Sequence, residues 1–270
     1  MHEKAVDVIL DMSCNFTSVL HQINSKNRKD IVEMIIRRVF LSLFAVTVIS
    51  PVTAQAQNFD FSGNVALTTS YSFRGITQSD EDPALQGGFD VSHDTGLYAG
   101  IWGSNVDFDD GDEAQLETDI YGGYSGSLKN FNYDVGLIHY AYPGADDSLD
   151  YDFTEASAAL GYDFEHFSSS VSLNYSPEYF GDSGDAYYYA ASVDVPLPKN
   201  FGLSGHFGHQ DIEDNTAFDA PDYNDWSAGV NYTVQKFDFS LRYVDTDLDQ
   251  PEDCSDGCDS RAIFSISRSF

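Results

Sequence analysis

The chain ends with the stretch RAIFSISRSF, which covers residues 261–270. Its even positions are mostly apolar and its odd positions carry serines; the alternating members are Ala262, Phe264, Ile266 and Phe270 against Ser265, Ser267 and Ser269. Because successive side chains of a β-strand point to opposite faces, this pattern predicts a strand with one apolar and one polar face. Such a strand suits a sheet that has lipid outside and water inside.

The same alternation recurs along the chain. Twelve stretches show it, at residues 59–73, 85–93, 97–108, 116–126, 131–141, 153–164, 167–175, 187–197, 201–209, 226–234, 237–243 and 261–270. In the third stretch the parity is ambiguous, because Tyr98 and Trp102 compete with Leu97 and Ile101. An even number of strands is typical of bacterial single-chain barrels, and closure requires the last strand to pair with the first.

The connections between these stretches alternate in length. The short ones are 93–96, 127–130, 165–166, 196–200 and 235–236, and the long ones are 75–84, 109–115, 142–152, 176–186, 210–225 and 244–260. Lys129, Lys199 and Lys236 lie in or beside short connections, whereas the long ones are rich in Asp and Glu. Short periplasmic turns and longer outer loops are typical of outer-membrane barrels.

Aromatic residues gather at the ends of the predicted strands. They include Phe59, Phe61, Tyr71, Phe73, Phe131, Tyr133, Tyr187, Tyr189, Phe237 and Tyr243. Rings at both membrane interfaces form the girdles of a membrane barrel. The alternative is a soluble β-sandwich, but no second apolar set closes a separate core. The sequence therefore predicts an all-β protein, an antiparallel transmembrane β-barrel of about 12 strands.

Residues 34–56 have the parts of a secretory signal peptide. Residues 34–38 are basic, 39–50 are mostly apolar, and Ala54-Gln55-Ala56 offers a small-x-small cleavage site. A bilayer span needs about 20 apolar residues, so this stretch is too short for one. A buried helix or a membrane anchor is the alternative. We predict that the barrel occupies residues 57–270.

Residues 1–33 lie ahead of this signal. The simplest interpretation is that translation starts at Met34 and that 1–33 are not translated; a long leader that starts at Met1 is the alternative. The full chain of 270 residues has a formal net charge of −31. Nucleic-acid binding requires a basic face, so this charge argues against it. Beyond the predicted signal, no apolar run is long enough for a transmembrane helix.

Cys254 and Cys258 stand in the sequence CSDGC, and Cys14 lies ahead of the signal. A zinc site would need two more soft ligands, and none is near in sequence. We expect a small disulfide loop between Cys254 and Cys258, formed after export to an oxidising compartment. The sequence predicts no metal centre and no cofactor.

Five stretches resemble a known family. They are YSFRGITQ at 71–78, PALQGG at 83–88, GLYAGIWGSNV at 96–106, LETDIYGGY at 116–124 and YAYPG at 140–144. They resemble the TorF-like family of proteobacterial outer-membrane porins, which implies an outer-membrane location and a channel role but no particular solute. Phe270 resembles the terminal signal by which the barrel assembly machinery recognises its clients. Arg268 departs from that pattern, where an apolar residue is usual.

The polar parity of the strands would line the lumen. Its charged members are Arg74, Asp90, Glu117, Asp119, Asp134, Glu155, Asp163, Asp194, Asp238 and Arg242. Eight acidic against two basic residues would attract cations, so we expect a diffusion channel for small solutes or ions with weak cation selectivity. Alternatively the charges pair and fill the lumen of a structural barrel, since twelve strands lie between the filled barrels of about 8 and the open ones of about 16–18.

Two other functions use different residues. A barrel hydrolase would need a serine beside a histidine; the candidate histidines are His93, His139, His166, His206 and His209, with Ser204 near His206. We expect no enzyme, because strand neighbours alone are weak evidence. The acidic segments 107–113, 245–247 and 253–259 lack the full spacing of a calcium loop and suit a solvated face. Divalent cations bridging them to lipopolysaccharide phosphates are the binding alternative.

Overall fold

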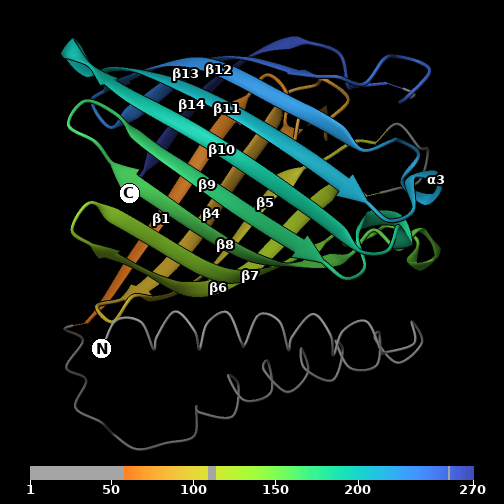
Figure 1. Ribbon diagram of the computed structural model, residues 1–270, viewed down its shortest axis with the longest axis horizontal. Helices are drawn as coiled ribbons and strands as arrows, with labels where there is room; N and C mark the ends of the chain where they lie inside the picture. The colour runs from red at the N-terminus through yellow and green to blue at the C-terminus, as the bar shows by residue number, and fades with distance from the viewer. Residues whose placement is uncertain (1–57, 109–113, 255) are drawn as a thin grey trace, which may run out of the picture. The chain divides into compact units, whose positions relative to one another are not determined.

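The computed structural model describes residues 58–108, 114–254 and 256–270. The predicted signal peptide at 34–56 and the segment 1–33 lie outside this range. The described chain forms a closed barrel of twelve strands (Figure 1). They are β1 (Phe59–Thr68), β4 (Ala84–His93), β5 (Leu97–Asn105), β6 (Leu116–Leu128), β7 (Phe131–Ala141), β8 (Phe153–Asp163), β9 (Ser168–Ser176), β10 (Ala186–Leu197), β11 (Phe201–Ile212), β12 (Tyr223–Val234), β13 (Phe237–Thr246) and β14 (Arg261–Ser269).

The barrel closes as the alternation predicts. Every strand is antiparallel to its neighbours, and β14 pairs with β1 in a register that sets Ser265 opposite Thr68 and Ser269 opposite Asn64. Phe270 continues this seam, because its N–H donates to the Gly63 carbonyl at 2.9 Å and its carbonyl accepts from the Gly63 N–H at 3.0 Å. The sheet therefore has no free edge, and the prediction of a twelve-stranded antiparallel barrel is confirmed.

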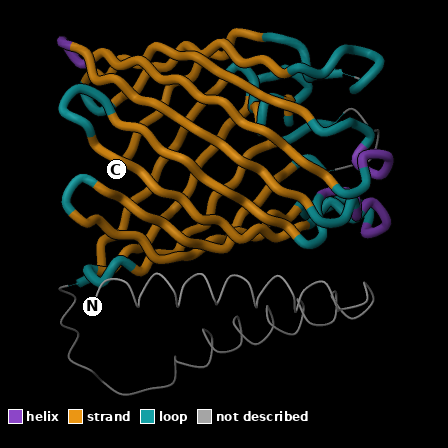
Figure 2. The backbone as a smooth tube through the Cα atoms, viewed as in Figure 1, coloured by secondary structure: helices purple, strands orange, loops and turns teal. Residues whose placement is uncertain are grey.

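The two ends of the barrel differ in their connections (Figure 2). We call one the turn end; its links are 94–96, 129–130, 164–167, 198–200 and 235–236. The other is the loop end, with links 69–83, 106–115, 142–152, 177–185, 213–222 and 247–260. The two-residue turns begin or end on residues in the left-handed region, such as Lys129 at φ 57° and Lys236 at φ 69°, as tight hairpins require.

In the described residues, helical structure is confined to short segments. The four-residue helix α3 (Asn215–Phe218) starts at Asp214, whose carboxylate accepts from the N–H groups of Thr216 and Ala217 at 3.0 and 3.1 Å. Three 3-10 turns are η1 (Asp147–Leu149), η2 (Phe180–Asp182) and η3 (Pro198–Asn200). Within the described residues, no helix has the length and apolar character that a membrane crossing needs.

The apolar parity of the strands faces outward. Phe61, Leu85 and Phe89 are 79%, 62% and 64% exposed, and large exposed hydrophobic side chains recur on all twelve strands. The ambiguous parity of the third stretch is resolved: Leu97 and Ile101 face out, at 58% and 45% exposure. A continuous exposed apolar band of this kind suits a lipid environment and not water.

The prediction of a first strand at 59–73 is wrong for its last five residues, 69–73. β1 ends at Thr68, and the chain turns into the barrel as a small hairpin of β2 (Ser72–Phe73) and β3 (Ile76–Thr77). We call residues 69–83 the inserted hairpin. Its turn places Arg74 and Gly75 at φ 46° and 86°, and a Cβ at Gly75 would collide with Thr246. Tyr71 and Phe73, which we assigned to a membrane girdle, therefore pack inside the barrel.

A hydrophobic core fills the loop end of the barrel interior. Its buried members are Val106, Ala114, Tyr140, Tyr142, Phe153, Tyr179, Ala186 and Ile212, with Tyr71, Phe73, Phe108, Tyr151, Phe180 and Phe218 packed against them. The rings meet face to edge or stacked, for example Tyr140 on Phe153 with centroids 4.3 Å apart. The inserted hairpin and the loops thus close much of this end with packed side chains.

Candidate functional site

An ion pair lies at the tip of the inserted hairpin. Arg74 Nη2 donates to both carboxylate oxygens of Glu155 at 2.7 Å, and Nη1 donates to Gln210 Oε1 at 2.8 Å. The two charged side chains are 5% and 2% exposed. Burial lowers the pKa of Arg74, but its interactions with Glu155, Tyr179 and Tyr140 together raise it, and the net shift of the pKa is upward. Arg74 therefore stays charged and binds β8 and β11 to the hairpin.

Aromatic rings surround the Arg74 guanidinium. Its Cζ lies 4.2 Å from the ring centre of Tyr188, 4.7 Å from Phe73 and 5.8 Å from Tyr179, which is within cation–π range. Burial raises the pKa of Tyr179 to about 12, so its hydroxyl stays neutral. We call Arg74, Glu155, Gln210 and these three rings the Arg74 cage.

Two further carboxylates lie in the loop-end half of the lumen. Glu117, 1% exposed, accepts from the Tyr71 hydroxyl at 2.8 Å, and burial beside Glu117 raises the pKa of Tyr71, which keeps this hydroxyl a donor. Asp119 is 6% exposed, and its Oδ1 has no hydrogen-bond partner among the described residues. This half of the lumen thus buries three predicted pore-lining acids, Glu117, Asp119 and Glu155, and Arg74 forms its ion pair with Glu155.

The turn-end half of the lumen is more open. Asp163, Asp194, Asp238 and Arg242 are exposed there. A cavity of about 450 Å³ opens between β6 and β10, and Asp163 and Asp194 belong to its lining. Water can therefore reach the charges of this half.

Three other lumen carboxylates accept hydrogen bonds from hydroxyl groups. Asp90 accepts from the Tyr121 hydroxyl, Asp134 from Tyr98 at 3.0 Å and Asp238 from Thr233. Of the ten predicted pore-lining residues, nine are strand residues of the polar parity. Arg74 is the correction, because it reaches the lumen from the turn of the inserted hairpin and not from a strand.

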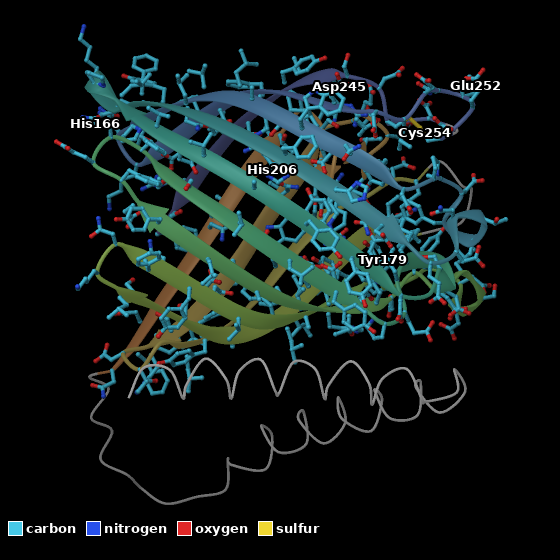
Figure 3. All side chains as sticks on the ribbon, viewed as in Figure 1. His166, Tyr179, His206, Asp245, Glu252 and Cys254 are labelled. Carbon is cyan, nitrogen blue, oxygen red and sulfur yellow. A yellow bond between two sulfur atoms is a disulfide. The ribbon has the colours of Figure 1, made fainter. Side chains whose placement is uncertain are left out.

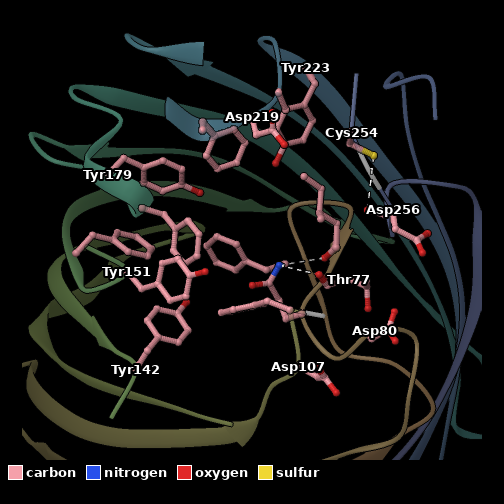
Figure 4. Close-up of a pocket in the computed structure, with 18 residues that line it drawn as sticks. Thr77, Asp80, Asp107, Tyr142, Tyr151, Tyr179, Asp219, Tyr223, Cys254 and Asp256 are labelled. Atoms are coloured by element: carbon pink, nitrogen blue, oxygen red, sulfur yellow. Dashed lines mark hydrogen bonds between the residues drawn. The ribbon is translucent and has the colours of Figure 1, made fainter. Parts of the chain in front are cut away.

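A second cavity, of about 570 Å³, lies at the loop end; we call it the loop-end cavity. Tyr142, Tyr151 and Tyr179 lie on one side of it, and Asp80 and Asp256 lie on the opposite side (Figure 4). Phe73 and Tyr179 line this cavity and also flank Arg74, so the cavity adjoins the Arg74 cage.

The loop that carries the two cysteines holds the inserted hairpin from outside. Cys254 and Cys258 form a disulfide, and the carbonyl of Gly257 between them accepts from the Thr77 N–H at 2.9 Å. Thr246 Oγ1 donates to the Cys258 carbonyl at 2.8 Å, which fixes this loop to the end of β13. The hairpin is therefore attached at its tip by Arg74 and at its second strand by the disulfide loop.

A histidine network lies midway along the lumen, where Figure 3 places His206. His206 Nδ1 lies 2.9 Å from Ser192 Oγ, and His206 Nε2 lies 2.8 Å from the Tyr188 hydroxyl and 3.4 Å from Asp225. Tyr188 donates to Asp225 at 2.8 Å, so Nε2–H can donate to Tyr188 and Nδ1 can accept from Ser192. Sequence spacing pointed to Ser204, which lies on the same strand as His206. It missed Ser192, because Ser192 lies opposite His206 only through the register of β10 with β11.

Acidic residues of the predicted segment 245–247 are engaged as hydrogen-bond acceptors. Asp247 accepts from the backbone and side-chain nitrogens of Asn224, both at 2.6 Å, and Asp245 accepts from the Tyr243 hydroxyl at 2.7 Å. In the described part of the chain, no three His, Cys, Asp or Glu side chains converge as metal ligands would. Most of the acidic segment 107–113 lies outside the described residues.

Residues 53–270 match a family model, Gcw_chp, described as a bacterial protein of unknown function. The chain belongs to the Gcw_chp family. No curated protein matches this Gcw_chp chain in sequence.

Solved structures share the Gcw_chp barrel. The NanC porin is 10% identical with a TM-score of 0.51 over 78% of this chain and 99% of its own. The COG4313 outer membrane channel from Pseudomonas putida F1 is 13% identical, with a TM-score of 0.45 over 83% and 100%. LpxR from Salmonella typhimurium, an enzyme barrel, is 9% identical, with a TM-score of 0.42 over 77% and 99%. At these identities the similarity shows the fold alone, which is that of outer-membrane porins and channels.

Proposed function

We propose that this protein is an outer-membrane channel for the passive diffusion of small solutes, with a preference for cations, and that the signal peptide at 34–56 exports it. The observation that carries the proposal is the composition of the lumen. The predicted lining has eight acidic and two basic residues, in a closed barrel whose outer face is apolar. Fixed negative charge in a water-filled passage concentrates cations and repels anions. The resemblance to the TorF-like porins supports the same proposal.

The passage is narrow at the loop end. There the Arg74 cage and the aromatic core occupy the interior next to the loop-end cavity, whereas Asp163, Asp194 and Asp238 of the turn-end half are exposed. We therefore expect a small conductance, limited by the inserted hairpin. In this orientation the turn end faces the periplasm and the loop end faces outward, as in other outer-membrane barrels.

Conductance of the purified protein in planar bilayers tests the proposal. Under a potassium chloride gradient we expect small current steps whose reversal potential has the sign of cation preference. Reconstitution is checked by co-flotation of the protein with lipid vesicles. An anion-selective reversal potential, or no current from a protein shown to be inserted, would overturn the proposal and favour a non-conducting structural barrel.

A hydrolase is a second candidate, because Ser192, His206 and Asp225 are in contact. Against it, Ser192 lies inside β10, which pairs with β9 and β11, so the backbone N–H groups beside it are engaged in the sheet. They cannot form an oxyanion hole, which is usually a major source of acyl-transfer catalysis. We expect no esterase or lipase turnover above that of the Ser192→Ala variant; turnover lost on that substitution would establish the enzyme.

A further inference from the structure

The loop-end cavity has the size and position of a ligand site. Its volume of about 570 Å³ lies within the range of about 300–1,000 Å³ that small-molecule pockets occupy. It is lined by residues from all six loop-end links and by the first residues of β8 and β12. It therefore stands where a solute from outside would first meet the barrel interior.

One wall of this cavity is aromatic. Phe108, Tyr151 and Phe180 contact one another there, with the Tyr151 and Phe180 rings stacked at 4.4 Å between centroids. Each ring touches at least one other aromatic ring, so the wall is a packed surface and not a set of separate side chains. Aromatic faces carry partial negative charge and attract cations, most strongly where water is excluded.

The other wall is acidic. Asp80, Asp107, Asp219 and Asp256 line it, and among the described residues that line the cavity none is basic. An anion entering this cavity would meet four carboxylates and no basic side chain among the described lining residues. A neutral ring would stack on the aromatic wall but would gain nothing from the acidic one. An inorganic cation would gain from the carboxylates and would leave the apolar wall unused.

The adjoining Arg74 cage shows which kind of group a carboxylate and aromatic rings hold together. There a guanidinium is bound by the carboxylate of Glu155 and by ring faces, two of which, Phe73 and Tyr179, also line the cavity. The same residue types therefore continue from the cage into the cavity, where rings and carboxylates line a volume of about 570 Å³.

We propose that the loop-end cavity binds organic cations, meaning ammonium or guanidinium groups that carry apolar substituents. The cationic group lies between the aromatic wall and the aspartates, and the apolar substituents cover the rings. As a site at the entrance of a transport path, the cavity rests on the proposed channel function. Binding itself does not, because it requires only the folded loop end.

Calorimetric titration of the detergent-solubilised full chain tests this inference. Choline is the probe, 3,3-dimethylbutan-1-ol is its neutral isostere, and potassium is the inorganic cation. We expect saturable binding of choline and at least fivefold weaker binding of the other two. Equal affinity for choline and its neutral isostere would show an apolar pocket only, and equal affinity for choline and potassium would show charge attraction only; either result overturns the proposal.

Matched variants locate the binding. Asp219→Asn removes a charge from the acidic wall, and Tyr151→Leu removes a ring while it keeps an apolar side chain; each is expected to weaken choline binding by about two- to fivefold, the equivalent of one exposed cation–π contact. Asp163→Asn, in the turn-end cavity, is the control and should leave binding unchanged. Thermal unfolding confirms that each variant is folded.

Binding that falls equally in Asp163→Asn and Asp219→Asn would place choline elsewhere or report net charge, and would overturn the site. The channel proposal fails independently, in the bilayer. A protein that binds choline without conducting would keep the site and lose the channel, and one that conducts without binding would do the reverse.

Discussion

Two tyrosine–carboxylate pairs lie in the same lumen under different conditions. Near the loop end, Tyr71 donates to Glu117, which is 1% exposed and sits beside the aromatic core. Toward the turn end, Tyr98 donates to Asp134 at 3.0 Å, and both residues are half-buried beside a water-accessible cavity. The bond is chemically the same, but only the first holds a carboxylate that water cannot reach.

The difference comes from the inserted hairpin. It fills the loop-end half with Tyr71, Phe73 and Arg74, so the acids there must be compensated by neighbours. The strands of the turn-end half have no such insert, and their aspartates stay hydrated. The loop-end half therefore behaves as a folded core, in which loss of a charge partner lowers stability. The turn-end half behaves as a charged water-filled passage, in which charge affects ions more than stability.

Deleting Phe270 should have the largest effect, and at the turn end. The residue adds two hydrogen bonds to the β1–β14 seam, its ring packs over Gly63, and it meets Phe89 at 6.4 Å between ring centres. Because closure removes the sheet edges, we expect a severalfold loss of folded protein in the outer membrane, measured by quantitative blotting of membrane fractions. Phe270→Tyr is the control. Normal levels of the deletion variant would contradict a role of the terminal strand in assembly.

Removal of the Arg74 guanidinium tests how the loop-end half of the lumen differs from the turn-end half. Arg74→Ala leaves Glu155 buried without its partner, so we expect a loss of about 3–5 kcal/mol in the free energy of unfolding. Shortening the side chain also frees space in the Arg74 cage, where we propose the constriction, so the conductance should rise. The measurements are urea unfolding in detergent and single-channel recording.

Arg242→Ala is the matched substitution in the open half. Arg242 is exposed, so its loss should change the unfolding free energy by no more than about 0.5 kcal/mol. Equal destabilisation by the two substitutions would mean that the halves do not differ in burial as described. An unchanged conductance in Arg74→Ala would remove the hairpin as the constriction.

The comparison also shows what the sequence could predict. Strand number, pairing and outward parity follow from alternation, because a period of two is imposed along every strand by the backbone itself. The nine lumen charges on strands could be placed for the same reason. Only the bounds differ, by three residues or fewer in eleven of the twelve stretches.

The inserted hairpin could not be predicted in this way. Tyr71 and Phe73 continue the alternation of β1, so pattern alone extended the strand through them. The Arg74-Gly75 pair was the available signal, since glycine favours the positive φ that the turn uses. That Arg74 meets Glu155 and Gln210, 81 and 136 residues away, depends on barrel closure, which brings together strands that share no local pattern.

A pair of single-atom changes measures the difference in burial. Tyr71→Phe removes a donor from the buried Glu117, and we expect a loss of about 1–3 kcal/mol in unfolding free energy, since a buried carboxylate loses a hydrogen bond that water does not replace. Tyr98→Phe removes the corresponding donor from Asp134, where water replaces it, and should cost about 0.5 kcal/mol. Both are compared by urea unfolding. A larger loss for Tyr98→Phe would reverse the assignment of the dry and wet halves.

The smallest effect is expected from the acids of the open half, and it should be on ions alone. The triple substitution Asp163→Asn, Asp194→Asn and Asp238→Asn removes three of the eight predicted pore-lining acids while it keeps side-chain size. Because these groups are exposed, their charges act on ions through water, and the reversal potential under a salt gradient should move part of the way toward zero. The unfolding free energy should stay unchanged within error.

High salt should reduce the difference in reversal potential from the unsubstituted protein, since it screens exposed charges. A shift in stability without a shift in reversal potential would mean that these carboxylates are structural, and that the turn-end half is a second core and not a passage.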